Sequence, residues 1–567
     1  MTTAENLQAV LEGRSELRRY EGGWGLPEPF CASLFTTKQM SRSSYLGLSR
    51  AESYAMRSIF NALQYITFDY QGDDVVLILS SAKGNVESLF DIAAEEDEYS
   101  LEGSAQRLAY VFGFVNEPIV VSNACISGVS ALHLARLLLD AGCYRYAVVC
   151  GFDVQSVFVV SGFQSLKAMS ANPCRPFDIN RSGLNLGEAA ATMVMASDDV
   201  VGEETDCLWH IGRTAVRNDA FHLTSPSKNA DGAVAALTAV MDGVSPYELG
   251  FVNLHGTATM FNDQMEAVAL KRTGLDVVPA NGLKGYYGHT MGAAGVLETV
   301  LSMAAADQGL LPGTRGFSEL GVSVPMNLSS DMREVSIPVF VKMISGFGGG
   351  NAALLASKGR RFDKVEQPTY GYTAENTDLK RLKILHSVRI EPGKVQVDDR
   401  RMVASDNDTN SFLTAIYKKY VGDYPKFYKM DLLSKLGFLA SELLLQAEGE
   451  ERFHQRSDRA VLLFNRSGSE TADRAYLKTI ESADNFFPSP SVFIYTLPNI
   501  VTGEIAIRNH YQGETAFYVL PERNTRLMDQ IVSCSIDGTA TKSAVCGWVD
   551  VEKEDRFCAE LSLVVRS

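Results

Sequence analysis

Short apolar strands alternate with amphipathic helices along residues 1–358, and this alternation is the strongest constraint on the fold. Candidate strands read VVLIL at 75–79, YAVVCG at 146–151 and PVFVKMIS at 338–345, and Gly-rich turns separate them from helical segments. Strands spaced in this way by helices are typical of layered α/β proteins. The sequence therefore predicts an α/β architecture for this part of the chain.

The remainder of the chain repeats part of the first section. Residues 359–380 are polar, contain a proline and show no periodicity, which predicts a linker. Within residues 381–567, RAVLLFNR aligns with DVVLILSS of the first section, and AVCGWVDV aligns with AVVCGFDV. The matches occur in the same order in both copies, so we expect a duplicated half-domain. The second copy is longer between its two matched blocks, around FFPSPSVFIYTLPNIVTGE (486–504).

Charge and composition exclude several classes of protein. Lys and Arg number 52 against 68 Asp and Glu, a net charge of −16, which argues against nucleic-acid binding. The chain has no apolar run of 18 residues and its start, MTTAENLQAV, lacks the features of a signal peptide, so we expect no membrane insertion. Nine cysteines without a CxxC pair fit reduced thiols in the cytoplasm and argue against a zinc ribbon.

One cysteine stands at the beginning of a helix. In VVSNACISGVSALHLARLLLDAG (120–142), Cys125 follows an apolar strand directly. Backbone N–H groups and the helix dipole at such a position are expected to lower the pKa of the thiol, and the thiolate is a nucleophile. Packing is the alternative role of a lone cysteine. An α/β-hydrolase elbow is excluded, because the positions that require glycine hold Asn123 and Ser127.

Two of the eight histidines lie in Gly- and Thr-rich loops. His255 lies in NLHGTAT and His289 in KGYYGHTMGAAGVLE. The others lack this setting, and His133, on the helix after the cysteine, is interpreted as a packing residue. Two such loops together with a cysteine at a helix start favour a catalytic site over structural histidines.

Six motifs in order resemble the elongating β-ketoacyl synthases of fatty acid and polyketide pathways, over nearly all of residues 1–358. They are SNACISG, RPFDINRSGLNLGEAAATMVM, HLTSPS, HGTAT, KGYYGHTMGAAGVLE and SGFGGGNAALL. The resemblance implies the thiolase fold, two similar halves stacked as a five-layer α-β-α-β-α sandwich, with a degenerate, non-catalytic thiolase-like half-domain in residues 381–567. In the alignment of the two copies, ILHSVRI (384–390) falls before residue 6, so the opening strand of the family would lie largely upstream of Met1. Either the true start lies further upstream, or another strand fills the gap.

The resemblance implies a decarboxylative condensation. Cys125 would take an acyl group from an acyl carrier protein, and His255 and His289 would donate hydrogen bonds to the enolate formed from malonyl-carrier protein. Lys284 and Glu298 would orient the surroundings of His289. The backbone N–H groups of Cys125 and Phe347 would form the oxyanion hole, and the Phe347 side chain would gate the acyl pocket. The expected substrate-binding residues are Thr224, Ser225, Thr257, Thr259 and Ser345.

No metal or redox cofactor is implied, because the substrates travel on the 4′-phosphopantetheine arm of the carrier protein.

For Thr224 and Ser225, a turn-forming role is an equal alternative. Two departures from the family pattern stand out. HGTATMFND lacks the proline of HGTxTPxGD but keeps Asp263. Ser345 replaces a phenylalanine, which is expected either to widen the mouth of the pocket or to loosen its gate.

The resemblance also implies partners. Carrier proteins are acidic, and Lys38, Arg42, Arg50 and Arg57 form a candidate docking patch, with a solvated helix face as the alternative. Because the sheets of the family join across a two-fold axis, we expect a homodimer or a heterodimer with a related subunit, with segment 104–125 near the interface.

The main rival function is a non-catalytic chain-length factor that pairs with an active synthase. Such partners typically lose the cysteine, so the retained Cys125, His255 and His289 favour the enzyme. A thioesterase would need a water-activating base and gives no reason for two histidine loops. Glu522 takes the place of the cysteine in the second copy, which we expect to act as a built-in chain-length factor or as a stabilising appendage. An aryl-polyene or flexirubin-type pigment pathway is the expected context.

Overall fold

The structure is a computed structural model. It describes residues 2–36, 47–91, 99–201, 207–359, 362, 382–403, 409–482, 486–553 and 555–566. The expected linker, 359–380, lies outside the described residues except for residues 359 and 362. The expected docking residues Lys38 and Arg42 also lie outside them.

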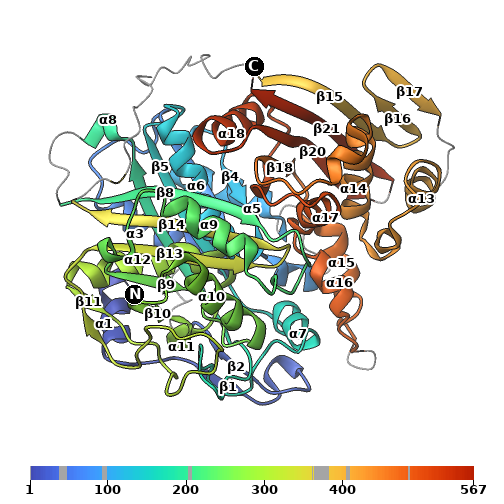
Figure 1. The fold of residues 1–567 in the computed structure, drawn as a ribbon. Helices are drawn as coiled ribbons and strands as arrows, with labels where there is room; N and C mark the ends of the chain where they lie inside the picture. Colours follow the sequence, from blue (N-terminus) through green and yellow to red (C-terminus); the bar gives the residue numbers. More distant parts are fainter. Residues whose placement is uncertain are drawn as a thin grey trace.

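Two large sheets organise the described part of the chain (Figure 1). One has eleven strands and the other five. The five-stranded sheet has the order β10 (Ala280–Gly282), β9 (Phe251–Leu254), β13 (Val339–Gly346), β14 (Gly350–Lys358), β8 (Trp209–Asn218). The eleven-stranded sheet has the order β17 (Arg400–Val403), β16 (Lys394–Val397), β15 (Leu382–Glu391), β21 (Arg556–Arg566), β20 (Ser543–Lys553), β18 (Arg459–Asn465), β19 (Thr515–Val519), β4 (Ile119–Val121), β3 (Val75–Ser80), β5 (Tyr146–Asp153), β7 (Ala189–Ala196).

The helices form three layers around these sheets. Helices α6 (Ser127–Asp140) and α12 (Ala294–Asp307) lie between the sheets, since α6 contacts β5 and β14 and α12 contacts β5 and β13. Helix α3 (Arg50–Leu63) covers β5 and β7 from outside, and α9 (Asp231–Val240) covers β8 and β14. This α-β-α-β-α order confirms the thiolase fold.

Burial explains why the sequence folds in this way. All six residues of β3, VVLILS, are buried, because helices cover both faces of the sheet. Helix α6 is buried along nearly its whole length for the same reason. The two central helices touch at Gly128 and Gly295. A Cβ on Gly128 would lie 2.8 Å from the backbone nitrogen of Val296, so this crossing requires glycine.

The eleven-stranded sheet contains two equivalent halves. From its middle outward, β4-β3-β5-β7 run one way and β19-β18-β20-β21 run the other, and the strands aligned by the sequence repeat take equivalent places. The halves meet where β19 pairs antiparallel with β4, with Tyr518 opposite Val121 and Val519 opposite Val120. Beyond β21 the sheet continues into β15, whereas among the described residues no strand pairs with the outer edge of β7.

The two copies share one hydrophobic interior. Helix α18 (Thr525–Gly538) packs on α6, and the Sγ atoms of Cys143 and Cys534 lie 3.8 Å apart at this contact. Buried apolar residues of both copies belong to the same clusters, as Leu137 and Ile531 do. Segment 104–125 therefore lies where the halves of one chain meet. Because β19 takes the edge of β4, a second subunit cannot pair there.

Shorter elements complete the chain. None of the helices among the described residues is both long and apolar enough to cross a membrane. The remaining helices are α1 (Thr3–Leu11), α5 (Leu101–Phe112), α7 (Val157–Ser165), α8 (Asp198–Val201), α10 (Met260–Thr273), α11 (Lys284–Tyr287), α13 (Thr409–Tyr420), α14 (Leu432–Leu445), α15 (Glu470–Leu477), α16 (Pro490–Tyr495) and α17 (Ile500–Asn509). Five short strands, β1 (Arg18–Tyr20), β2 (Phe30–Ser33), β6 (Leu186–Gly187), β11 (Leu310–Leu311) and β12 (Arg333–Glu334), lie in two small sheets.

Candidate active site

Cys125 lies at the junction between β4 and α6, as the sequence predicts. It belongs to a single 3₁₀ turn, Ala124–Ile126, that leads directly into the helix. The preceding residue, Ala124, has φ of +49°, a left-handed conformation that is strained for a residue with a side chain. Such strain is typical of functional turns, and here it turns the chain sharply from the strand into the helix.

The thiol of Cys125 is protonated at rest. Burial raises the pKa of Cys125 to about 12, although the Lys284 ammonium and the backbone N–H groups of Cys125 and Phe347 act in the opposite direction. The expectation that the helix start lowers this pKa is therefore wrong, because the cost of burying a thiolate exceeds the stabilisation by nearby dipoles. These two N–H groups are the ones expected to form the oxyanion hole.

Both predicted histidines face Cys125. The ring centroids of His255 and His289 lie 4.9 Å apart with their planes at 85°, and a ligand atom from each ring lies within 4.8 Å of the others and of the Cys125 sulfur. The backbone N–H of Met291 donates to Nδ1 of His289 at 3.2 Å, so a neutral His289 carries its proton on Nε2. That Nε2, like Nδ1 of His255, has no hydrogen-bond partner among the described residues. His289 is therefore poised to donate to a ligand.

The surroundings keep both imidazoles neutral. Burial lowers the pKa of each histidine well below its usual value, and the buried Lys284 and Lys342 ammonium groups lower it further. Cys125, His255 and His289 are also the one group among the described residues whose spacing would suit a metal ion. The protonated Nε2 of His289 offers no lone pair to a metal, so the arrangement fits a nucleophile with hydrogen-bond donors better than a metal centre.

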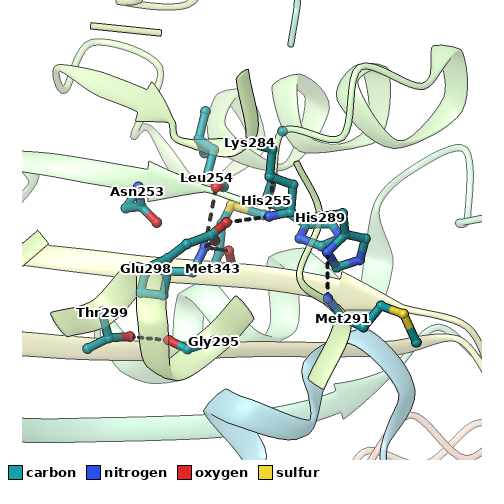
Figure 2. A network of polar contacts seen from close by, with 12 residues as sticks. Asn253, Leu254, His255, Lys284, His289, Met291, Gly295, Glu298, Thr299 and Met343 are labelled. Carbon is teal, nitrogen blue, oxygen red and sulfur yellow. Dashed lines mark hydrogen bonds and ion pairs between the residues drawn. The ribbon is translucent and has the colours of Figure 1, made fainter. Parts of the chain in front are cut away.

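A buried ionic network lies next to the histidines (Figure 2). Nζ of Lys284 donates to the carbonyl oxygen of His255 and to Oε1 of Glu298, both at 2.7 Å. Nζ of Lys342 lies 2.6 Å from the other carboxylate oxygen of Glu298 and donates to the Met343 carbonyl at 2.9 Å. Sequence reasoning found Lys284 and Glu298 but missed Lys342, whose signal was a lone charge inside the apolar strand PVFVKMIS.

Two acids of α10 hold the histidine loop in place. Glu266 accepts hydrogen bonds from the backbone N–H groups of His255 and Gly256 at 2.7 and 2.8 Å. Asp263, the residue retained from the family motif, accepts from those of Ala258 and Phe177. Burial raises the pKa of Glu266 to about 7 and that of Asp263 to about 6. The loop geometry therefore depends on α10 and does not need the missing proline.

A cavity of about 380 Å³ opens onto the cysteine and the two histidines. Lys284 and Glu298 lie behind its wall. Thr257 and Thr259 are hydrogen-bonded to each other at 2.9 Å, and Ser345 donates to Asn351. The backbone N–H groups of Thr224 and Ser225 donate hydrogen bonds to Nδ1 of His222, so these two residues also form a turn. The sequence-predicted residues that line the cavity are Cys125, His255, His289, Phe347, Thr224, Ser225, Thr257, Thr259 and Ser345.

The second copy contacts both segments that carry the N–H groups of the expected oxyanion hole. Next to the nucleophile, the backbone N–H of Phe517 in β19 donates to Oδ1 of Asn123 at 2.7 Å. The side-chain amide of Asn499 donates to the carbonyl of Phe347 at 2.8 Å. Sequence reasoning missed Asn123 and Asn499, because each acts through a residue far away in the chain.

Aromatic rings of both copies meet at one wall of the cavity. Phe163 lines the cavity and packs against Phe347, with ring centroids 6.0 Å apart. On its other side, Phe493 of α16 meets Phe163 edge-on at 5.6 Å. A Cβ at Gly162 would overlap the Phe493 ring, so glycine is required there. The extra segment of the second copy thus packs against a residue that lines the cavity.

The expected docking patch is only partly available. The Arg50 guanidinium lies 2.9 Å from Glu87 and also pairs with Glu188, and its side chain is only 18% exposed. These two carboxylates neutralise its charge, so it does not present a free cation to a carrier protein. Arg57, two turns further along α3, lies on the surface.

Comparisons with known proteins agree with this geometry. Residues 77–200 match the family described as beta-ketoacyl synthase, N-terminal domain, and residues 209–318 match its C-terminal domain. The ketoacyl synthase alpha subunit of the tetracenomycin polyketide synthase from Streptomyces glaucescens is 31% identical over 289 residues, which are 48% of this chain and 66% of that protein. A putative mitochondrial 3-oxoacyl-[acyl-carrier-protein] synthase of Schizosaccharomyces pombe is 28% identical over 44% of this chain and 63% of its own. Both domains of the β-ketoacyl synthase family are thus matched within residues 77–318, and the chain covers 66% and 63% of the length of these two relatives.

Solved structures show the same fold. A beta-ketoacyl synthase from Burkholderia phymatum matches 63% of this chain and 96% of its own, with a TM-score of 0.57 and 22% identity. The PfaC keto synthase–chain length factor matches 100% of this chain and 77% of its own, with a TM-score of 0.76 and 14% identity. The second match extends over the second copy as well.

Proposed function

We propose that the protein is an elongating β-ketoacyl-[acyl-carrier-protein] synthase. One observation supports this most: a buried thiol and two neutral imidazoles converge on one cavity, and Nε2 of His289 is free to donate into it. The reaction needs no metal or redox cofactor, and its substrates arrive on the phosphopantetheine arm of a carrier protein.

The first step is transfer of an acyl group to Cys125. The sulfur attacks the carbonyl carbon of the acyl thioester, a new C–S bond forms, and the bond to the pantetheine sulfur breaks. The thiol proton leaves with the pantetheine thiol, so the step needs no standing thiolate, consistent with the high pKa of Cys125. The N–H groups of Cys125 and Phe347 stabilise the tetrahedral oxyanion.

The second step is decarboxylation and condensation. The bond between the malonyl carboxylate and its α-carbon breaks, CO₂ leaves, and the enolate oxygen accepts hydrogen bonds from His289 and His255. The α-carbon attacks the acyl carbonyl, a C–C bond forms, and the C–S bond to Cys125 breaks. The released thiolate takes up one proton, which its high pKa favours. We expect Thr257 and Thr259 to hold the pantetheine arm.

We propose that the second copy is a built-in chain-length factor. Glu522 lies at the position equivalent to Cys125, is exposed and cannot accept an acyl group. Phe493 packs against Phe163, which lines the cavity, and we infer that the end of an acyl chain reaches this part of the wall. The match with the PfaC keto synthase–chain length factor over the whole chain supports this assignment.

Intact-protein mass spectrometry tests the proposal against the rival, a non-catalytic partner subunit. The protein is mixed with acyl-carrier proteins of different chain lengths and then with malonyl-carrier protein. Wild type should gain the mass of one acyl group and then release 3-oxoacyl-carrier protein. Cys125→Ala should do neither, whereas Cys207→Ala, at an exposed cysteine, should behave as wild type. Wild type that takes up no acyl group of any length would favour the rival.

The partner and the pathway are proposed on the same basis. We propose an acyl carrier protein as the donor of both substrates. An aryl-polyene or flexirubin-type pigment pathway stays a prediction from the sequence.

A further inference from the structure

Lys342 is a second buried cation in the site, and the proposed reaction has not yet used it. Its side chain is fully buried in β13, with neighbours that are apolar along the strand. Burying an ammonium group is costly unless it is paired. Its partner Glu298, 2.6 Å away, is already paired with Lys284 at 2.7 Å. Two ammonium groups therefore share one carboxylate, which leaves an excess positive charge.

The other charges around Lys342 do not cancel this excess. The titratable groups that act on it are Glu298 from α12, Lys284 from α11 and Glu266 from α10. Burial raises the pKa of Glu266 to about 7, so that carboxyl group is only partly ionised at neutral pH. Burial lowers the pKa of Lys342 to about 8, which leaves it mostly protonated at pH 7.

We propose that Lys342 is a positioning residue for the condensation step. Its ammonium group is held by Glu298 and two backbone carbonyls, next to the histidines. Together with burial and Lys284, its positive charge keeps both imidazoles neutral, and it attracts the developing enolate. A positive charge beside an imidazole disfavours its protonation. A neutral imidazole keeps a lone pair, which His289 uses to accept from Met291 while its Nε2–H points at the substrate.

This inference rests on the proposed function, so the experiment separates the two. Malonyl-carrier protein decarboxylation is measured against pH for wild type, Lys342→Met and a control, Lys358→Met. Lys358 pairs with Asp307 at the surface end of the neighbouring strand β14, so its replacement tests the loss of an ion pair outside the site. Wild type that does not decarboxylate malonyl-carrier protein at any pH overturns the proposed function and this inference with it.

Lys342→Met should slow decarboxylation at pH 7 on the order of tenfold, the effect of about 1.4 kcal/mol of lost electrostatic stabilisation. Removing the positive charge raises the pKa of both histidines, so the acid limb of its pH profile should move to higher pH. Wild type should also lose activity as Lys342 loses its proton near pH 8, and this basic limb should be missing in Lys342→Met. Lys358→Met should follow the wild-type profile. A folded Lys342→Met protein with the wild-type rate and profile overturns the inference.

A double variant separates charge from packing. Lys342→Met with Glu298→Gln removes one charge of each sign relative to wild type and restores the excess positive charge through Lys284 alone. Its acid limb should return toward the wild-type position, and a limb that stays with Lys342→Met overturns the charge argument. Where Lys342→Met does not fold, the wild-type profile decides, because the absence of a basic limb near pH 8 overturns the inference.

Discussion

Replacing Phe493 by alanine should both destabilise the protein and lengthen its products. The Phe493 side chain is 1% exposed and packs between Phe163, Phe158 and Tyr476, with ring centroids 5.6, 6.4 and 5.2 Å away. A Phe→Ala change in such a core costs about 3–5 kcal/mol, because it leaves a cavity. That cavity opens next to Phe163, in the wall of the proposed acyl pocket.

Two assays check this prediction. Chemical unfolding should show the loss of stability, and mass spectrometry of carrier-protein-bound products should show chains extended by additional two-carbon units. The control is Phe487→Ala, in the same segment but 74% exposed, which should change stability by less than about 0.5 kcal/mol and leave product length unchanged. If Phe493→Ala shows the stability loss but makes products of wild-type length, the reasoning is refuted. If the alanine variant does not fold, the same two assays are applied to Phe493→Leu, which is a smaller change.

Three further substitutions test the site. Cys125→Ala should abolish acyl transfer and condensation while leaving the melting temperature close to that of wild type, and acylation at the wild-type rate would contradict the assignment. His289→Ala should keep acyl transfer but lose at least ~10² in the rate of condensation, the usual effect of removing one oxyanion donor, as measured by separate assays of the two half-reactions. Asn499→Ala removes the hydrogen bond to the Phe347 carbonyl and should cost about 1 kcal/mol of stability and slow acyl transfer, in thermal denaturation and single-turnover assays.

Much of the fold and the central residues of the site could be predicted from the sequence. The composition of the apolar strands around VVLIL and YAVVCG predicts their burial, because a strand that is covered on both faces is apolar throughout. Cys125 was found by its place between a strand and a helix, and the two histidines by their Gly- and Thr-rich loops.

The rest depends on contacts between distant segments. Asn123 and Phe517 are 394 residues apart, and nothing in either local sequence indicates their hydrogen bond. The sign of the pKa shift of Cys125 is set by how completely the layers bury it, which a helix-start motif does not report. The sequence repeat indicates two copies, but it does not indicate that they pair through β4 and β19. Packing across the whole sheet determines that pairing.

The pairing of β4 with β19 has a consequence for how the protein is made. Because both strands belong to one chain, dilution cannot separate the halves, and assembly does not depend on concentration. The ribosome, however, completes β4 long before β19. At about 5–20 residues per second, the edge of β4 waits about 20–80 s for its partner strand, and an unpaired edge is a site for aggregation. Two separate subunits would have to find each other by diffusion, whereas the joined halves need no such encounter. The edge of β4, however, stays exposed during translation and must be protected from aggregation until β19 emerges.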